Sequence, residues 1–178
     1  MTAIRPLRTA AGRDDPPTGA RPWPSGAATT FDGLYRASYR KMVRLAWLLV
    51  GSTAAAEDVV HDAFLAVHQR WDRLDNPGAY LRTTVVNTAL RAQRRRRGER
   101  DALAAVGEPP PTGDPVVDTT WDAVQLLRPE RRAVVVLRYW ADLPEAEIAE
   151  IVGVRPSTVR SRTVRALARL KKELPNDH

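Results

Sequence analysis

Apolar residues recur every three to four positions from Thr30 onward, the spacing of helices that bury one face. A first helix is expected to end at Gly51, and a second to begin at Ser52 or Thr53, whose hydroxyls can cap it. Asn76-Pro77 predicts a third start, because asparagine caps helices and proline fits the first helical position. The expected buried positions are Leu34, Met42, Leu45 and Leu49, then Val60, Ala63, Phe64, Val67 and Trp71, then Leu81, Val85, Val86 and Leu90.

The second half of the chain repeats this pattern with prolines as helix starts. Pro129, Pro144 and Pro156 each precede an apolar-periodic run, and proline's missing N–H costs nothing in a first helical turn. Gly153 is expected to end the short helix 145–152, and Pro175 to end the last one at Leu174. No segment alternates with period two, so the predicted fold class is all-α.

Two stretches break the periodicity and divide the chain. Residues 1–28 are rich in proline, glycine and alanine and predict a disordered tail, while 98–117 predict a flexible linker. Two small helical domains are therefore expected, at residues 29–97 and 118–175.

The spacing Ile148-Ala149, Gly153, Val159 is that of a helix-turn-helix. Alanine permits a close helix crossing, and glycine permits the left-handed backbone of the tight turn. No acid occurs between Val154 and Glu173, and the helix after the turn carries hydroxyls and guanidiniums that can reach phosphates and base edges. The alternative is a helical hairpin with a solvated basic face.

The N-terminal half of the chain combines an acidic helix with a basic one. Glu57, Asp58 and Asp62 mark the second helix, and an arginine cluster ends the third. Acidic and apolar groups suit a basic protein partner, whereas aromatic, amide and basic groups suit an opened nucleic-acid strand. An arginine run alone is also typical of a solvated helix end.

Composition narrows the function classes. The formal net charge is +7 and the calculated pI about 10.5, which favours a polyanionic partner. The chain has no cysteine, so disulfides and thiolate metal sites are excluded. No apolar run approaches the roughly 20 residues that cross a bilayer, and no secretory signal precedes the helices, so a cytoplasmic protein is expected.

Three segments together resemble the extracytoplasmic-function (ECF) group of the sigma-70 family of RNA polymerase sigma factors. AAEDVVHDAFLAVHQRW and NPGAYLRTTVVNTALRAQRRRR resemble region 2 of that family, and LRPERRAVVVLRYWADLPEAEIAEIVGVRPSTVRSRTVRALARL resembles region 4. The resemblance covers residues 31–174 and implies a bacterial, nucleoid-associated protein without enzymatic activity, cofactor, metal or small-molecule substrate. It also implies that the protein directs polymerase to promoters.

The resemblance also implies three groups of site residues. Those expected to contact the β and β′ subunits of core polymerase are Asp58, His61, Asp62, Phe64 and Leu65. Those expected at the −10 promoter element are Arg82, Asn87, Arg91, Arg94 and Arg95. Those expected at the −35 element are Arg155, Ser157, Thr158, Arg160, Ser161, Arg162 and Arg165.

The chain departs from the family pattern at three of these positions. His61 stands where glutamine is usual, Arg91 where an acid is common, and Arg155 where a capping serine or threonine is frequent. Many members of the family are held inactive by an anti-sigma factor, and such a partner could exist for this chain.

Two other function classes remain open at this stage. A self-sufficient helix-turn-helix regulator would need a dimerisation surface, and no dimer helix is evident. An enzyme or metal protein could use Asp58, His61, Asp62 and His68, whose spacing lets some share a helix face. Converging ligands from a second helix are needed for such a site, and the sequence offers none.

Overall fold

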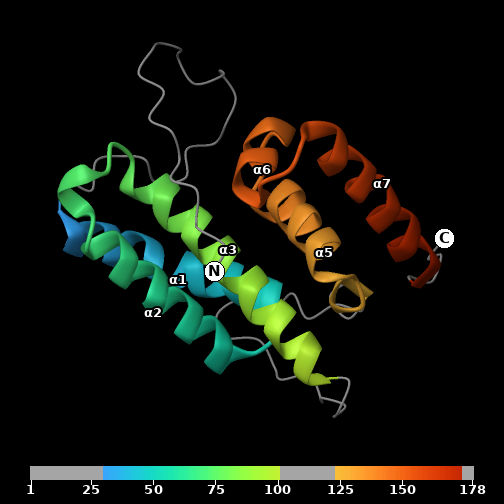
Figure 1. Ribbon diagram of the computed structural model, residues 1–178, viewed down its shortest axis with the longest axis horizontal. Helices are drawn as coiled ribbons and strands as arrows, with labels where there is room; N and C mark the ends of the chain where they lie inside the picture. The colour runs from blue at the N-terminus through green and yellow to red at the C-terminus, as the bar shows by residue number, and fades with distance from the viewer. Residues whose placement is uncertain (1–29, 101–122, 174–178) are drawn as a thin grey trace.

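The computed structural model describes residues 30–100 and 123–173, and every regular element in these ranges is helical, as predicted. The N-terminal part consists of α1 (Phe31–Val50), α2 (Thr53–His68), the short 3₁₀ helix η1 (Trp71–Arg73) and α3 (Pro77–Arg100). The helices α1, α2 and α3 pack side by side (Figure 1). The tail 1–28 and residues 101–117 of the expected linker lie outside the described residues.

Local capping chemistry explains where these helices begin and end. The side chains of Thr30 and Ser52 accept hydrogen bonds from the backbone N–H of Gly33 (3.2 Å) and Ala55 (3.4 Å). The Asn76 side chain accepts one from Ala79 at 3.0 Å. The three predicted starts are therefore confirmed, and Ser52 rather than Thr53 caps α2. The helix α3 continues to Arg100, past the expected boundary at 97, although glycine at position 98 is a poor helix former.

The C-terminal part consists of α5 (Pro129–Val135), the π-helical turn η2 (Val136–Trp140), α6 (Glu145–Val152) and α7 (Pro156–Glu173). In η2 the Ala141 N–H donates to the Val136 carbonyl at 3.0 Å, and the following Asp142 has a φ of 52°. This wide turn, which proline and glycine spacing does not predict, redirects the chain from α5 into α6.

Gly153 closes the turn between α6 and α7 with a φ of 68°, a backbone conformation that favours glycine. A Cβ atom there would meet no atom within 4 Å, so the cost of a substitution is conformational and not steric. We expect Gly153→Ala to lower the free energy of unfolding by about 1 kcal/mol, measured by denaturant titration. Gly153→Asn should lose less, because asparagine tolerates this conformation. Equal losses in the two variants would contradict the explanation.

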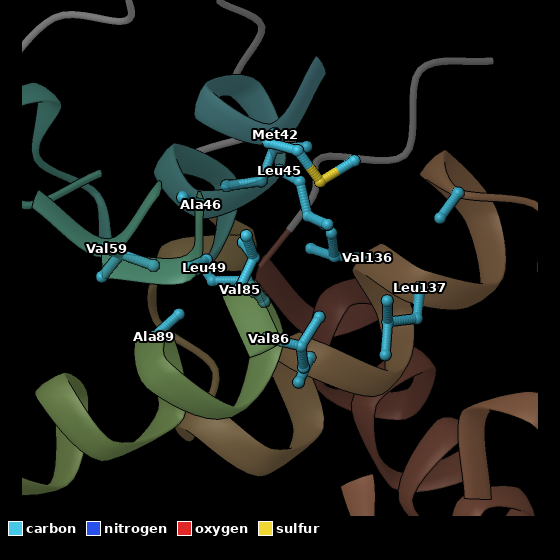
Figure 2. Packing of buried hydrophobic residues seen from close by; sticks show 14 of the residues in the cluster. Met42, Leu45, Ala46, Leu49, Val59, Val85, Val86, Ala89, Val136 and Leu137 are labelled. Atoms are coloured by element: carbon cyan, nitrogen blue, oxygen red, sulfur yellow. The ribbon is translucent and has the colours of Figure 1, made fainter. Parts of the chain in front are cut away.

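One hydrophobic core runs through both halves of the chain. Met42, Leu45 and Leu49 of α1 gather with Val85 and Val86 of α3, and Val136 and Leu137 of the C-terminal part join the same cluster (Figure 2). A smaller second cluster contains Val124, Leu127, Val135, Ala166 and Leu170. The sequence predicts two domains but not that they pack together, because helical periodicity reports which face is buried and not against what.

Buried Arg132 reinforces the junction between the halves. Its guanidinium donates to the carbonyl oxygens of Leu49 (2.8 Å) at the end of α1 and of Leu127 (3.2 Å). It also donates to the carbonyl of Gln125. The last carbonyls of a helix lack intrahelical partners, so Arg132 satisfies an acceptor that α1 leaves open.

Candidate nucleic-acid and protein interfaces

The helix α7 presents a face of hydrogen-bond donors. Arg155, Ser157, Arg160 and Arg165 are exposed. The remaining predicted −35 residues are half-buried: Thr158, Ser161 and Arg162. Val159 is only 2% exposed and anchors the helix against α6. The face therefore belongs to a helix whose opposite side is fixed in the core, which is what major-groove recognition requires.

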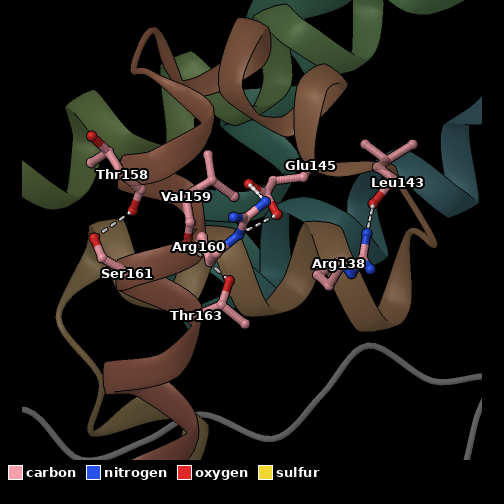
Figure 3. Close-up of polar contacts among 8 residues, drawn as sticks. All are labelled: Arg138, Leu143, Glu145, Thr158, Val159, Arg160, Ser161 and Thr163. Carbon is pink, nitrogen blue, oxygen red and sulfur yellow. Dashed lines mark hydrogen bonds and ion pairs between the residues drawn. The ribbon is translucent and has the colours of Figure 1, made fainter.

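Several polar groups of α7 already have intramolecular partners (Figure 3). The Ser161 hydroxyl donates to the Thr158 carbonyl and the Thr163 hydroxyl to the Val159 carbonyl, each at 3.0 Å. The Arg160 guanidinium faces Glu145 of α6, with Nη2 to Oε1 at 3.3 Å and Nε to Oε2 at 3.4 Å. By contrast, Arg162 and Arg165 make no ion pair within the described part of the chain.

The start of α7 does not depend on a capping side chain. Arg155 occupies the position before Pro156, and its carbonyl accepts from the N–H groups of Thr158 (2.9 Å) and Val159 (3.2 Å). The departure from serine or threonine therefore leaves the helix start in place and adds a guanidinium beside it.

The predicted −10 residues on α3 differ in how accessible they are. Arg95 and Arg91 are exposed, and Arg91 Nε donates to the Asn87 carbonyl at 3.3 Å. Asn87 is half-buried. Arg94 is exposed but forms an ion pair with Glu130 of α5, with 3.9 Å between Arg94 Nε and Glu130 Oε1. The structure thus gathers these residues along one helix, as the sequence predicts.

Arg82 is the exception, since it is only 7% exposed. Its guanidinium forms an ion pair with Glu147 of α6, from the other half of the chain. Burial lowers the pKa of Arg82 below its usual value, although an arginine stays protonated at any ordinary pH. Neither Glu147 nor Glu130 is a site residue that sequence reasoning identifies, because nothing in the sequence pairs residues so far apart.

The predicted polymerase-binding residues lie on α2. Asp58, His61 and Asp62 are exposed, and Leu65 is 48% exposed. Phe64 differs, because it is only 4% exposed and offers no surface to a partner in this arrangement. The surface of α2 therefore still carries an acidic and apolar strip, formed by Asp58, His61, Asp62 and Leu65 without Phe64.

Phe64 instead belongs to an aromatic cluster between α1 and α2. Its ring packs against those of Phe31 (centroids 6.1 Å apart), Tyr35 (4.8 Å) and Tyr39 (6.4 Å). Burial, together with Tyr35 and Glu57, raises the pKa of the Tyr39 phenol. This packing fixes α2 against α1 and so orients the exposed strip.

A metal site on α2 would require His68 to lie close to Asp58, His61 and Asp62. The His68 ring packs edge-on against Phe31, with centroids 4.9 Å apart. Among residues 30–100 and 123–173, no three acidic or histidine side chains come together as a metal site would require. Over the same ranges, no helix has the length and apolar character needed to span a membrane.

Comparison with protein families matches two parts of the chain. Residues 34–99 match the family described as Sigma-70 region 2, and residues 119–170 match Sigma-70, region 4. The RNA polymerase sigma-E factor of Streptomyces coelicolor is 31% identical over 161 residues, covering 84% of this chain and 88% of that protein. The ECF RNA polymerase sigma factor SigM of Mycobacterium tuberculosis is 34% identical over 160 residues, covering 84% and 80%.

Solved structures show the same fold. The sigma factor RpoE of Bartonella quintana, crystallised with the anti-sigma factor NepR, superimposes with a TM-score of 0.68 at 24% identity, covering 83% of this chain and 98% of that one. CnrH in complex with the cytosolic domain of CnrY superimposes with a TM-score of 0.61 at 25% identity, covering 86% and 93%.

Proposed function

Because this chain belongs to the ECF group of the sigma-70 family, and is therefore a promoter-recognising transcription initiation factor and not an enzyme, we propose how its surfaces divide that work. The strip on α2 binds core RNA polymerase, α3 binds the opened −10 element, and α7 reads the −35 element as duplex. The observation that carries this division is the separation of an acidic, apolar face on α2 from an acid-free donor face on α7.

Recognition by α7 comes first in this mechanism. The free guanidiniums of Arg162 and Arg165 contact phosphates and base edges, which sets the register of the protein on the duplex. The hydroxyls of Ser157 and Thr158 lie in the first turn of α7, where the helix dipole also favours phosphate.

Capture of the −10 strand then depends on α3. Unstacking a base costs a few kcal/mol, which aromatic stacking and phosphate contacts must offset. Asn87 and the guanidiniums of Arg91, Arg94 and Arg95 supply the polar contacts. Neither module binds its element tightly alone, and tethering both on polymerase raises the effective concentration of each. The protein then acts in the bacterial cytoplasm, at the nucleoid.

The polymerase contact can be tested on α2. We expect Asp58→Arg/Asp62→Arg to weaken binding to core RNA polymerase at least about tenfold, because like charges would then face a basic partner. Fluorescence anisotropy of the labelled chain, titrated with core polymerase, measures this affinity. Asp72→Arg/Asp75→Arg is the matched control, since both residues are exposed and the charge change is the same. Equal affinity in the two double variants would remove α2 from the polymerase interface.

A self-sufficient helix-turn-helix regulator is the competing function. It predicts nanomolar, sequence-specific duplex binding by the isolated chain as a dimer. The proposed function predicts weak binding by the free chain and strong, salt-sensitive binding by the polymerase complex.

A further inference from the structure

We propose that the outward face of α1 is a third DNA-contacting surface, which holds the phosphate backbone of the promoter duplex beside the −10 element. This face carries four basic side chains that are not among the residues assigned to polymerase or promoter contacts on α2, α3 and α7: Arg36, Arg40, Lys41 and Arg44. We name them the α1 basic stripe. The inference rests on the proposed function, because it adds a contact to the DNA that α3 and α7 bind.

The residues of the stripe share one side of the helix. Arg36, Arg40 and Arg44 follow one another at intervals of four residues, which is a rise of about 6 Å per step, so their side chains form a row. Lys41 lies beside this row and is exposed. The Arg44 guanidinium lies over the Trp47 ring, 5.5 Å from its centroid, and this contact holds it at the end of the row.

The rest of the protein leaves most of this charge without a partner. Arg40 and Lys41 are exposed and form no ion pair with any residue that the structure describes. Arg36 pairs with Asp32, the one acid of α1, but the two side chains are 80% and 70% exposed, and such a pair contributes little. Like charges four residues apart also destabilise a helix. A negatively charged partner would relieve this repulsion.

The chemistry of the stripe selects duplex phosphates among the negatively charged partners. Arginine supplies three of its four charges, and a guanidinium matches two phosphate oxygens with parallel N–H groups. The stripe contains no aromatic or amide side chain, which a surface that captures unstacked bases would need. The polymerase surface proposed for α2 faces acidic residues and is therefore basic, so it cannot also satisfy the stripe.

The position of α1 brings the stripe close to the DNA that α3 binds. The two helices pack directly against each other. Axes of packed helices lie about 8–10 Å apart, which is less than the roughly 12 Å width of the major groove of B-DNA. A duplex that leads into the opened strand on α3 therefore comes within reach of long side chains on α1. Contacts of this kind hold the backbone and carry no sequence information.

The first test measures promoter binding by the complex of the full chain with core polymerase. We expect Arg40→Ala/Lys41→Ala to weaken binding to a promoter fragment about tenfold and to lower the slope of log affinity against log salt by about 2, because two phosphate neutralisations are lost. Lys171→Ala/Lys172→Ala is the matched control, since both lysines are exposed and the charge lost is the same. The control should keep the slope of the unsubstituted chain.

A stability measurement separates a DNA contact from a structural role. Arg40 and Lys41 are exposed and alanine is a good helix former, so the melting temperature of Arg40→Ala/Lys41→Ala should not fall. It should rise slightly, because Arg40 has like charges four residues away on both sides, at Arg36 and Arg44. Affinity for core polymerase, measured by fluorescence anisotropy, should be unchanged.

The second test locates the DNA directly. The chain has no native cysteine, so an iron–EDTA reagent can be tethered to Ala37→Cys, an exposed position beside the stripe. Ala54→Cys, an exposed position on α2, is the control. In the promoter complex, the reagent on Ala37→Cys should cleave the backbone of the duplex beside the −10 element, and the reagent on Ala54→Cys should leave that duplex intact.

Three results would overturn the proposal: equal affinity and salt slope in the two double variants, weaker binding of Arg40→Ala/Lys41→Ala to core polymerase, or no cleavage of duplex DNA from Ala37→Cys. The second result would place an acidic protein surface on the stripe. In all three cases, promoter-specific transcript starts made with the unsubstituted chain would leave the proposed function intact. The absence of such starts would instead contradict the proposed function, and the DNA contact of the stripe with it.

Discussion

Replacing Arg132 with methionine is expected to lower the free energy of unfolding by about 3 kcal/mol, because three carbonyl groups then lose a buried donor. The affected oxygens are the backbone carbonyls of Leu49, Gln125 and Leu127. Arg132 itself is only 6% exposed. Methionine keeps most of the aliphatic volume, so the loss reports hydrogen bonding more than a cavity.

Thermal unfolding followed by circular dichroism measures this effect. A loss of this size corresponds to a fall in melting temperature of roughly 6–12 °C for a chain of this length. Arg131→Met is the matched control, since Arg131 is the preceding residue in α5 and is not fully buried. If both variants melted at the same temperature, the junction between modules would not depend on Arg132.

The second large effect is expected on promoter binding, when the two unpaired guanidiniums of α7 are removed. We expect Arg162→Ala/Arg165→Ala to weaken promoter binding by the polymerase complex about a hundredfold, at about 1–3 kcal/mol for each contact. The slope of log affinity against log salt should also fall by about 2, because two phosphate neutralisations are lost. A promoter fragment recovered by mapping transcript starts provides the DNA, and filter binding at several salt concentrations gives both quantities.

Lys171→Ala/Lys172→Ala is the control for this experiment. Both lysines are exposed at the far end of the same helix, and the total charge lost is identical. The control should lose much less affinity, because these residues lie several turns beyond the helix-turn-helix. Matching losses in the two variants would show that α7 contributes only its overall charge and does not read DNA at its N-terminal end.

The sequence predicts the helices well because the residues that start and end helices act locally. Proline at a first turn, glycine at a left-handed end and asparagine at a cap each work within a few residues of the backbone they shape. Thr30, Gly51 and Gly153 therefore mark real boundaries. The π-helical turn at Val136–Trp140 carries no such residue, and the sequence does not reveal it.

The candidate site is predicted less completely, because exposure depends on tertiary packing. Asp58, Asp62 and Arg165 are exposed as a helical face predicts, but Phe64 and Arg82 are buried by partners distant in sequence. The sequence predicts Phe64 both in the apolar stripe and at the polymerase interface, and the aromatic cluster favours the first position. For Arg82 the pairing with Glu147 spans 65 residues, which periodicity cannot report.

We expect this chain to bring core RNA polymerase to promoters through α2, α3 and α7 together. The most direct measurement mixes the purified chain with bacterial core polymerase and fragmented genomic DNA of its source, and then sequences the 5′ ends of the transcripts. We expect starts that share two spaced upstream elements and that disappear when the chain is omitted. No binding to core polymerase, together with specific duplex binding by the free chain, would contradict the claim and identify a helix-turn-helix regulator.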